Sequence, residues 1–378
     1  MTDNIISYVD KYKRTGFDQM LFNEVDSLVL CQLSYLNFRD LVPGIKEPST
    51  SVSLQDIVAT AEKDRLYEEY WFKEDNRKLV EKVTQSFRFM DMKLNYFVEV
   101  LNEEHGIQFS AVTFLLGDKS VYVAFRGTDV TLVGWKEDMM LACSEPLRSQ
   151  ELAAEYLDKV SSTFAGQFRV GGHSKGGNLA VYAAMFCKSD VRRRICDIYD
   201  HDGPGFRPEI LKEGHFDFIR SKVHKYIPKE SIVGILLETN MDYEVVESTG
   251  IGALQHNTFT WKSKNGQFVK AKGMRRNKRV ADAALNEWIY SLSDREVSVF
   301  IDTIFDILAA SDAKTLFEII EDPKKSVSGV FSAYKELDKT TKSAVFSTIR
   351  KLGETLGERT FENLVERTKI LKLGDKDK

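Results

Sequence analysis

Several absences narrow the class of protein to which this 378-residue chain can belong. No stretch approaches the ~20 consecutive apolar residues that a membrane-spanning helix needs. The N-terminus lacks a basic segment followed by an apolar one, so we expect no signal peptide. Only 4 cysteines occur, without a C-x-x-C pair, which is typical of reduced thiols in a cytoplasmic protein. We therefore expect cytoplasmic localisation and no transmembrane segment.

Positive charge is also not in excess, because the formal net charge is −4 at pH 7. This balance argues against general nucleic-acid binding, and no histidine or cysteine spacing indicates a metal or cofactor site. The hydrophobic content of 43% is enough for a large core. The length alone allows one large domain or two to three ordinary ones.

The most informative stretch runs from Phe168 to Ala184. An apolar strand leads into Gly172-His173-Ser174-Lys175-Gly176, and a run of small, helix-forming residues follows. This G-x-S-x-G pattern between a strand and a helix is typical of a nucleophile elbow, where a strained turn exposes the serine hydroxyl. Glycines on both sides allow the tight turn. The pattern predicts Ser174 as a nucleophile and the backbone N–H of Lys175 as an oxyanion donor, and it places the His173 side chain in the sheet flank.

Upstream of this elbow, the periodicity of the chain changes twice. Residues 1–40 are predicted to be mostly helical and residues 55–103 to be helical, with a loop rich in proline and serine between them. The aromatic residues of the second segment form either a packing face or a wall over an apolar pocket. From Gln108 to Phe125, two apolar runs joined at Gly117-Asp118 predict a hairpin. Residues 149–164 predict an amphipathic crossover helix in a mostly parallel α/β sheet.

The second strand of this hairpin runs into Arg126-Gly127-Thr128-Asp129, with Trp135 and Asp138 further on. Together with the G-H-S-x-G-G pattern of Gly172 to Gly177, this run resembles the class 3, fungal-type lipases. The resemblance covers roughly residues 105–262. It implies an α/β-hydrolase fold, and it implies that Thr128, the residue after Arg-Gly, donates to the oxyanion.

Two residues are candidates for the acid that orients a catalytic histidine. Asp202 lies in a D-G-P-G turn at the carboxyl end of a predicted strand, the edge where open α/β sheets bind ligands. The class 3 resemblance instead implies an aspartate after the next strand, where this chain has Ser231, preceded by Glu230. Either Glu230 substitutes or the acid is Asp202, which we favour. The D-G-P-G turn also resembles an uncharacterised bacterial family of lipase-like hydrolases.

His256 is the candidate base, because it lies in a loop after the last predicted core strand. The chain order serine, acid, histidine is that of α/β-hydrolases. The other histidines lie in the elbow, beside Asp202, or in connecting segments. The consecutive arginines 192–194 are interpreted as a solvated turn rather than a phosphate site.

The remaining sequence, from a basic linker at residues 270–279 to the C-terminus, predicts several helices without a catalytic signature. We expect a lipase-like domain at residues 1–268 and a helical extension at 269–378, whose helices offer a surface for a homo-oligomer. The predicted function is a serine hydrolase that cleaves small-molecule or lipid carboxylic esters through Ser174, His256 and Asp202, without a cofactor. The alternative is a catalytically silent scaffold of the same fold.

Overall fold

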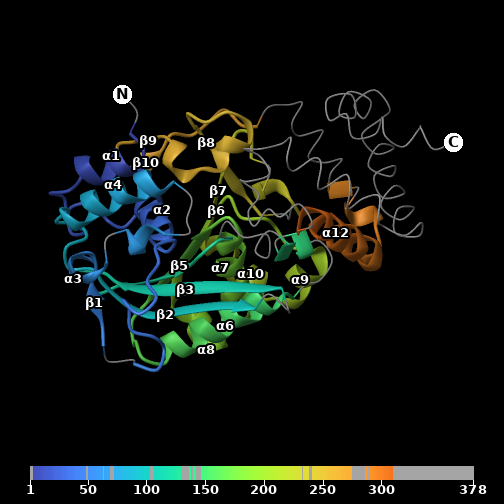
Figure 1. The fold of residues 1–378 in the computed structure, drawn as a ribbon, viewed down its shortest axis with the longest axis horizontal. Helices are drawn as coiled ribbons and strands as arrows, with labels where there is room; N and C mark the ends of the chain where they lie inside the picture. The colour runs from blue at the N-terminus through green and yellow to red at the C-terminus, as the bar shows by residue number, and fades with distance from the viewer. Residues whose placement is uncertain are drawn as a thin grey trace. The chain divides into compact units, whose positions relative to one another are not determined.

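The structure is a computed structural model of the chain (Figure 1). It describes residues 3–47, 50–62, 64–68, 72–102, 106–128, 136–137, 139–141, 146–231, 233–237, 241–274, 286–287 and 289–309. Two compact units are present: residues 1–141 with 145–275, and residues 142–144 with 276–378. The domain boundary after residue 268 stays a prediction. The role of the C-terminal helices in a homo-oligomer also stays a prediction, because most of these helices lie outside the described residues.

An eight-stranded sheet forms the centre of the first unit, in the order β1 to β8. The pairs from β1 to β4 are antiparallel, and the pairs from β4 to β8 are parallel. This mostly parallel sheet with flanking helices is an α/β-hydrolase fold, as the sequence predicted. The strands are β1 (Val52–Ser53), β2 (Lys93–Asn102), β3 (Ile107–Leu115), β4 (Val121–Phe125), β5 (Phe168–His173), β6 (Ile195–His201), β7 (Val223–Pro228) and β8 (Tyr243–Val246).

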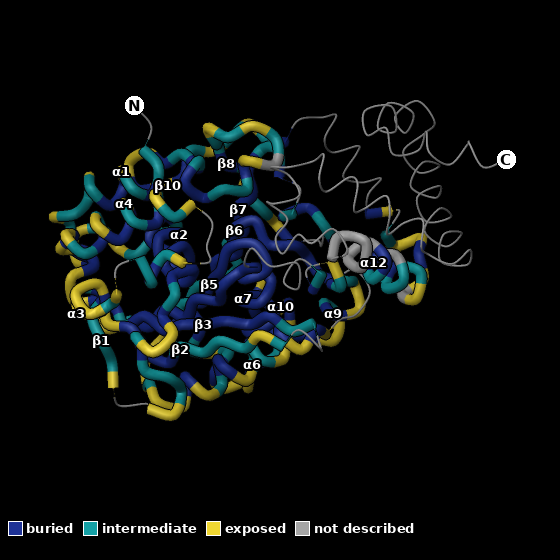
Figure 2. The backbone as a smooth tube through the Cα atoms, in the orientation of Figure 1, coloured by how far each residue is buried: buried dark blue, intermediate teal, exposed yellow. Residues whose placement is uncertain are grey.

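Alternating side chains of the strands enter two separate cores. On β4, Val121, Val123 and Phe125 pack with the core beneath α6 (Arg148–Ser161) and α7 (Lys175–Phe186). Tyr122 and Ala124 face the opposite core, which includes α2 (Glu24–Leu33). Both faces of the sheet are therefore covered, and Figure 2 shows the central strands and α7 as buried. The crossover helix predicted at residues 149–164 is confirmed as α6.

One helical expectation was wrong. The sequence predicted helix throughout residues 55–103, but residues 93–102 form β2, which pairs antiparallel with β3. Leu94, Asn95 and Tyr96 are all buried there, and Leu94 enters the core with α2 whereas Tyr96 enters the core beneath α6 and α7. A bulge interrupts the register between Asn95 and Val98, and Tyr96 takes a φ of +56° there. Because of this bulge, the sequence of β2 does not show the regular alternation by which a strand is predicted.

The helices of the N-terminal region form a layer over the face of the sheet on which α2 lies. Asn23 caps α2, because its side chain accepts from the N–H groups of Val25 and Asp26. Asp26 is fully buried and pairs with Arg88, whose Nη2 lies 2.5 Å from Asp26 Oδ2. This layer consists of α1 (Ile5–Lys11), α2, α3 (Leu54–Thr60), η1 (Arg65–Tyr67) and α4 (Lys73–Thr84).

The two ends of the first unit lie side by side. Asp3 and Ser263 exchange backbone hydrogen bonds, with N···O distances of 3.0 and 2.6 Å. The Asn4 amide donates to the carbonyl of Phe259 at 3.1 Å. Ser263 belongs to β9 (Ser263–Lys264), which pairs with β10 (Gln267–Phe268). The N-terminal residues are therefore anchored to the segment that follows His256.

The short elements after α7 line the parallel half of the sheet. The arginines expected in a solvated turn instead end α8, where Arg192 donates to carbonyls at the end of α7 and Arg194 to the carbonyl of Ser161 at the end of α6. These elements are α8 (Ser189–Arg194), α9 (Pro208–Glu213), α10 (Phe216–Ile219), η2 (Arg220–Lys222), η3 (Val233–Ile235), η4 (Gly252–His256) and η5 (Thr258–Thr260). In the second unit, α12 (Asp294–Ala309) coincides with a predicted helix.

Candidate active site

The turn between β5 and α7 has the geometry of a nucleophile elbow. Ser174 takes a φ of +59°, a conformation that side chains other than glycine rarely adopt. A Cβ at Gly172 would lie 2.1 Å from the carbonyl carbon of Gly176, and a Cβ at Gly176 would lie 2.1 Å from the carbonyl oxygen of Phe125. Both positions therefore require glycine. The Ser174 N–H donates to the carbonyl of His201 at 2.9 Å, which fixes the elbow against β6.

The carboxylate of Asp202 and the imidazole of His256 lie in hydrogen-bond contact. His256 Nδ1 is 2.6 Å from Asp202 Oδ2, although the two residues are far apart in sequence. Asp202 follows β6 with a φ of +58° and is fully buried. Since a carboxylate accepts, Nδ1 carries the proton and Nε2 is left as the basic nitrogen of the ring. The His256 side chain is 25% exposed.

Ser231, at the position where an aspartate was expected, supports the same carboxylate. Its hydroxyl donates to Asp202 Oδ1 at 2.5 Å and accepts from the N–H of Gly234 at 2.9 Å. An aspartate at position 231 would bring a second carboxylate against Asp202, and two like charges in one buried place are unfavourable. The hydroxyl instead satisfies the oxygen that His256 does not contact.

Glu230, the other candidate acid, contacts the His256 loop rather than its imidazole. Glu230 Oε2 accepts from the N–H of Gly252 at 2.6 Å. The Glu230 N–H donates to the side chain of Gln255 at 3.1 Å. Glu230 therefore holds η4 from both ends, and Asp202 is the carboxylate that the structure brings to His256.

His173 lies against His256 rather than in the sheet flank, where the sequence analysis placed it. The two ring centroids are 4.5 Å apart. His173 Nε2 donates to the His256 carbonyl at 3.0 Å, and His173 Nδ1 accepts from the Tyr35 hydroxyl at 3.1 Å. Burial, with the neighbouring His256, lowers the pKa of His173 well below its usual value. His173 is therefore neutral, and it fixes the backbone of the His256 loop.

The α2 layer contributes further contacts that sequence reasoning missed. Tyr35, which follows α2, contacts His173 as described above. Gln32 of α2 accepts from the Thr258 hydroxyl at 2.7 Å and so holds the residues just after His256. The only sequence signal was the density of apolar residues around α2, which predicted burial but not a role at the site. Tyr35, just after α2, thus holds His173, and Gln32 of α2 holds the segment that follows His256.

The segment after β4 lies against the elbow. A Cβ at Gly127 would lie 2.4 Å from the His173 carbonyl oxygen and 3.1 Å from Ser174 Cβ. Thr128 follows directly and is 8% exposed, and Lys175 is the first residue of α7. The structure thus brings the chain around both predicted oxyanion donors to Ser174. Asp129, Trp135 and Asp138 of the lipase-like run lie outside the described residues.

Ser174 and His256 share no hydrogen bond in the part of the chain that the structure describes. Their segments are connected through His173, which contacts His256 and directly precedes Ser174. Hydrogen bonds of this kind are often long or misaligned in ligand-free enzymes.

Buried polar groups brace the D-G-P-G turn that carries Asp202. Lys225 Nζ donates to Asp200 Oδ2 at 2.8 Å and to the Gly203 carbonyl at 2.5 Å. Asp200 Oδ1 accepts from the Gly203 N–H at 2.8 Å. Burial raises the pKa of Asp200, and Lys225 opposes that shift. Asn178 of α7 donates to the carbonyls of Pro204 and Gly205.

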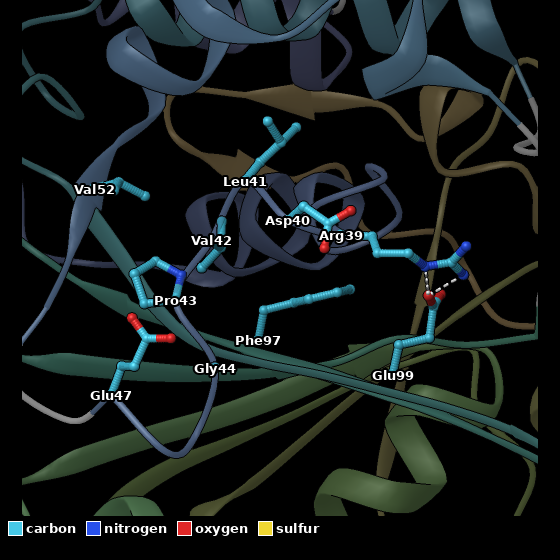
Figure 3. Close-up of a pocket in the computed structure, with 10 residues that line it drawn as sticks. All are labelled: Arg39, Asp40, Leu41, Val42, Pro43, Gly44, Glu47, Val52, Phe97 and Glu99. Carbon is cyan, nitrogen blue, oxygen red and sulfur yellow. Dashed lines mark hydrogen bonds and ion pairs between the residues drawn. The ribbon is translucent and has the colours of Figure 1, made fainter.

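A cavity of about 520 Å³ is lined by none of the residues of this site (Figure 3). It is formed by β2 and residues 39–47, and its Glu99 accepts from Arg39 Nε at 3.1 Å. Glu99 also pairs with Arg126, the residue before Gly127, at 2.9 Å. The cavity is therefore connected to the post-β4 segment through one carboxylate.

Within the described residues, no group of three or more His, Cys, Asp or Glu side chains could hold a metal ion. Among the described helices, none is both long enough and apolar enough to cross a membrane.

The elbow, the sheet order and the flanking helices define a lipase-like α/β-hydrolase fold. Residues 83–306, more than half of the chain, match the model of the Mbeg1-like family, and the chain belongs to that family. None of the proteins with curated annotation matches the sequence significantly.

Solved structures of two lipases are similar to the chain. The Rhizomucor miehei lipase in its native propeptide complex is 18% identical over 45% of this chain, with a TM-score of 0.31. This chain spans 66% of that lipase. M37 lipase is 14% identical over 57% of this chain and 70% of its own, with a TM-score of 0.36.

Proposed function

We propose that this protein is a serine hydrolase that cleaves carboxylic esters, related to the class 3 lipases and to bacterial lipase-like hydrolases. The observation that carries the proposal is the 2.6 Å contact between His256 Nδ1 and the buried Asp202 carboxylate, beside a strained serine elbow. A buried carboxylate that fixes the tautomer of a histidine next to a nucleophile is the arrangement that acyl transfer needs.

In the proposed mechanism, Ser174 Oγ attacks the ester carbonyl while His256 Nε2 removes its proton. The C–O bond of the tetrahedral intermediate then breaks, and His256 returns the proton to the leaving alcohol. Water hydrolyses the acyl-enzyme by the same steps. Asp202 keeps Nδ1 protonated and stabilises the imidazolium. The backbone N–H groups of Lys175 and Thr128 bind the oxyanion, and one such donor contributes about 3–4 kcal/mol to the transition state in comparable sites.

An apolar acyl chain fits the surroundings of His256. Ile251 and Leu254, on either side of the start of η4, are 81% and 68% exposed. Phe72, on the N-terminal layer, is 38% exposed and its ring contacts that of Phe259 at 6.3 Å between centroids. These exposed apolar side chains, on the loop of His256 and on the ring partner of Phe259, support an apolar acyl chain in the substrate.

The catalytically silent scaffold stays a second candidate, because Ser174 Oγ and His256 share no hydrogen bond in the described structure. One experiment separates the two functions. The purified protein is treated with a fluorophosphonate probe and assayed with p-nitrophenyl esters of increasing acyl length. The hydrolase should be labelled at Ser174 and should turn over esters, whereas a scaffold should do neither. A preference for short acyl groups would indicate an esterase rather than a lipase.

A further inference from the structure

The side chain of Lys175 has a role that the elbow itself does not require. Only the backbone N–H of this residue takes part in the proposed oxyanion hole, yet its side chain is fully buried. Lys175 Nζ lies 2.8 Å from the Gln108 carbonyl oxygen, 2.6 Å from Gln108 Oε1 and 2.7 Å from Glu137 Oε2. Glu137 Oε2 also accepts from the Gln108 N–H at 3.0 Å. We name these three residues the Lys175 clamp.

Stability is a poor explanation for this arrangement. Removing an ammonium and a carboxylate from water costs several kcal/mol for each ion, and apolar side chains of similar volume often replace such a pair without loss. A positive charge in the first turn of α7 is also unfavourable beside the positive end of the helix dipole. An apolar side chain at position 175 would avoid both costs.

The position of the clamp offers a better explanation. The ion pair ties Glu137 to Lys175, which carries the first donor. Gln108 lies near the start of β3, two residues before Ser110, whose carbonyl accepts from the Arg126 N–H at 2.9 Å. The clamp therefore joins Lys175 to the strand that holds the chain just before Thr128, the second proposed donor. Gly127, directly before Thr128, approaches Ser174 closely.

We propose that the Lys175 clamp is a positioning device that sets the distance between the two oxyanion donors. It rests on the proposed function, because it assigns these residues to the same site. Lys175 and Glu137 touch no reacting atom through their side chains; they act through the backbone of the elbow and of β3, which holds the end of β4. Breaking the clamp should therefore lower kcat and leave KM nearly unchanged, because an oxyanion hole binds the transition state rather than the substrate.

The test compares Lys175→Met, Glu137→Gln and the double variant Lys175→Met/Glu137→Leu. Each single change leaves a buried polar partner unsatisfied and should lower the thermal midpoint. The double variant removes both charges and should regain most of the lost midpoint. Its kcat for a p-nitrophenyl ester and its rate of fluorophosphonate labelling should nevertheless stay about 10²-fold below the wild-type values, the effect of losing one oxyanion donor. Glu137→Gln keeps an acceptor oxygen for Lys175, so its kcat should lie between those of the wild type and the double variant.

Arg88→Met/Asp26→Leu is the matched control, because it removes a buried ion pair from the α2 layer, with side chains 1% and 0% exposed. Its kcat should stay within about twofold of wild type whatever its midpoint. A clamp double variant with wild-type kcat and labelling rate would overturn the inference and leave the proposed function intact. A wild-type protein that neither hydrolyses esters nor reacts with the probe would refute the proposed function, and the inference with it.

Discussion

The two halves of the central sheet contribute differently to the structure and to the candidate active site. The antiparallel half, β1 to β4, contributes packing to two cores and one cavity, and its bulge at Tyr96 is buried. The parallel half, β4 to β8, brings Thr128, Ser174, Asp202 and Ser231 to the carboxyl ends of successive strands. Parallel strands place equivalent ends at one edge, so residues from distant parts of the chain meet there. Catalysis should therefore depend mainly on the parallel half, with Gln108 of the clamp as the exception on β3, whereas stability should depend on both halves.

The largest expected effect is the loss of turnover on replacing Ser174 by alanine. Without the nucleophile, kcat for a p-nitrophenyl ester should fall by about 10⁴-fold or more. The fold should be unaffected, since the elbow depends on glycines and on the Ser174 backbone rather than on its hydroxyl. Steady-state kinetics with a thermal melt tests both statements. Parental turnover in this variant would remove the basis of the proposed mechanism.

The next largest effect should distinguish the two candidate acids, Asp202 and Glu230, by the loss of kcat when each is replaced by its amide. Asp202→Asn should lower kcat by about 10³- to 10⁴-fold, because an amide no longer fixes the Nδ1–H tautomer of His256. Glu230→Gln keeps an acceptor for the Gly252 N–H and should lower kcat by no more than about tenfold. Comparable losses in both variants, measured at one pH above 7, would contradict the assignment of Asp202.

A core substitution in the antiparallel half should give the opposite pattern. Leu94 on β2 is fully buried in the α2-side core, so Leu94→Ala should lower the free energy of unfolding by about 2–5 kcal/mol. Its kcat at 25 °C should stay within about twofold of wild type. Denaturant unfolding and kinetics on the same preparation check this, and a loss of kcat without a loss of stability would break the division between the halves.

The effect that is smallest at neutral pH is a pH dependence of stability from His201 on β6. Its imidazole is fully buried beside the Ser27 hydroxyl, and burial lowers its pKa to about 3. The unfolded chain binds a proton near pH 6.5 whereas the folded chain stays neutral, so stability is full above pH 6.5 and declines as pH falls toward 3. The slope is up to about 1.4 kcal/mol per pH unit for this residue. His201→Phe should flatten the curve of unfolding free energy against pH between 4 and 6.5; an unchanged slope would contradict the neutral state.

Sequence patterns predicted the elements that have local signals in both halves of the sheet. The elbow has its glycine spacing, the hairpin β3–β4 its apolar runs and turn, and the crossover helix its amphipathic periodicity. β2 was missed because a bulge breaks its alternation. The acid stayed open because the choice between Asp202 and Glu230 depends on how two loops pack, which no local pattern encodes. The contacts of Tyr35 and Gln32 with the histidine segments are long-range and leave no spacing to read.

The joining of the chain's first residues to the segment after His256 affects the order in which the molecule can assemble. Asn4 and its partner Phe259 are 255 positions apart. A chain emerging from the ribosome has Ser174 and Asp202 available long before residue 256, and Asp3 and Asn4 cannot pair with residues 259–263 until these have been made. Acquisition of the imidazole and docking of the N-terminal segment therefore belong to the same late step of biosynthesis, and truncated nascent chains should carry an elbow without a base.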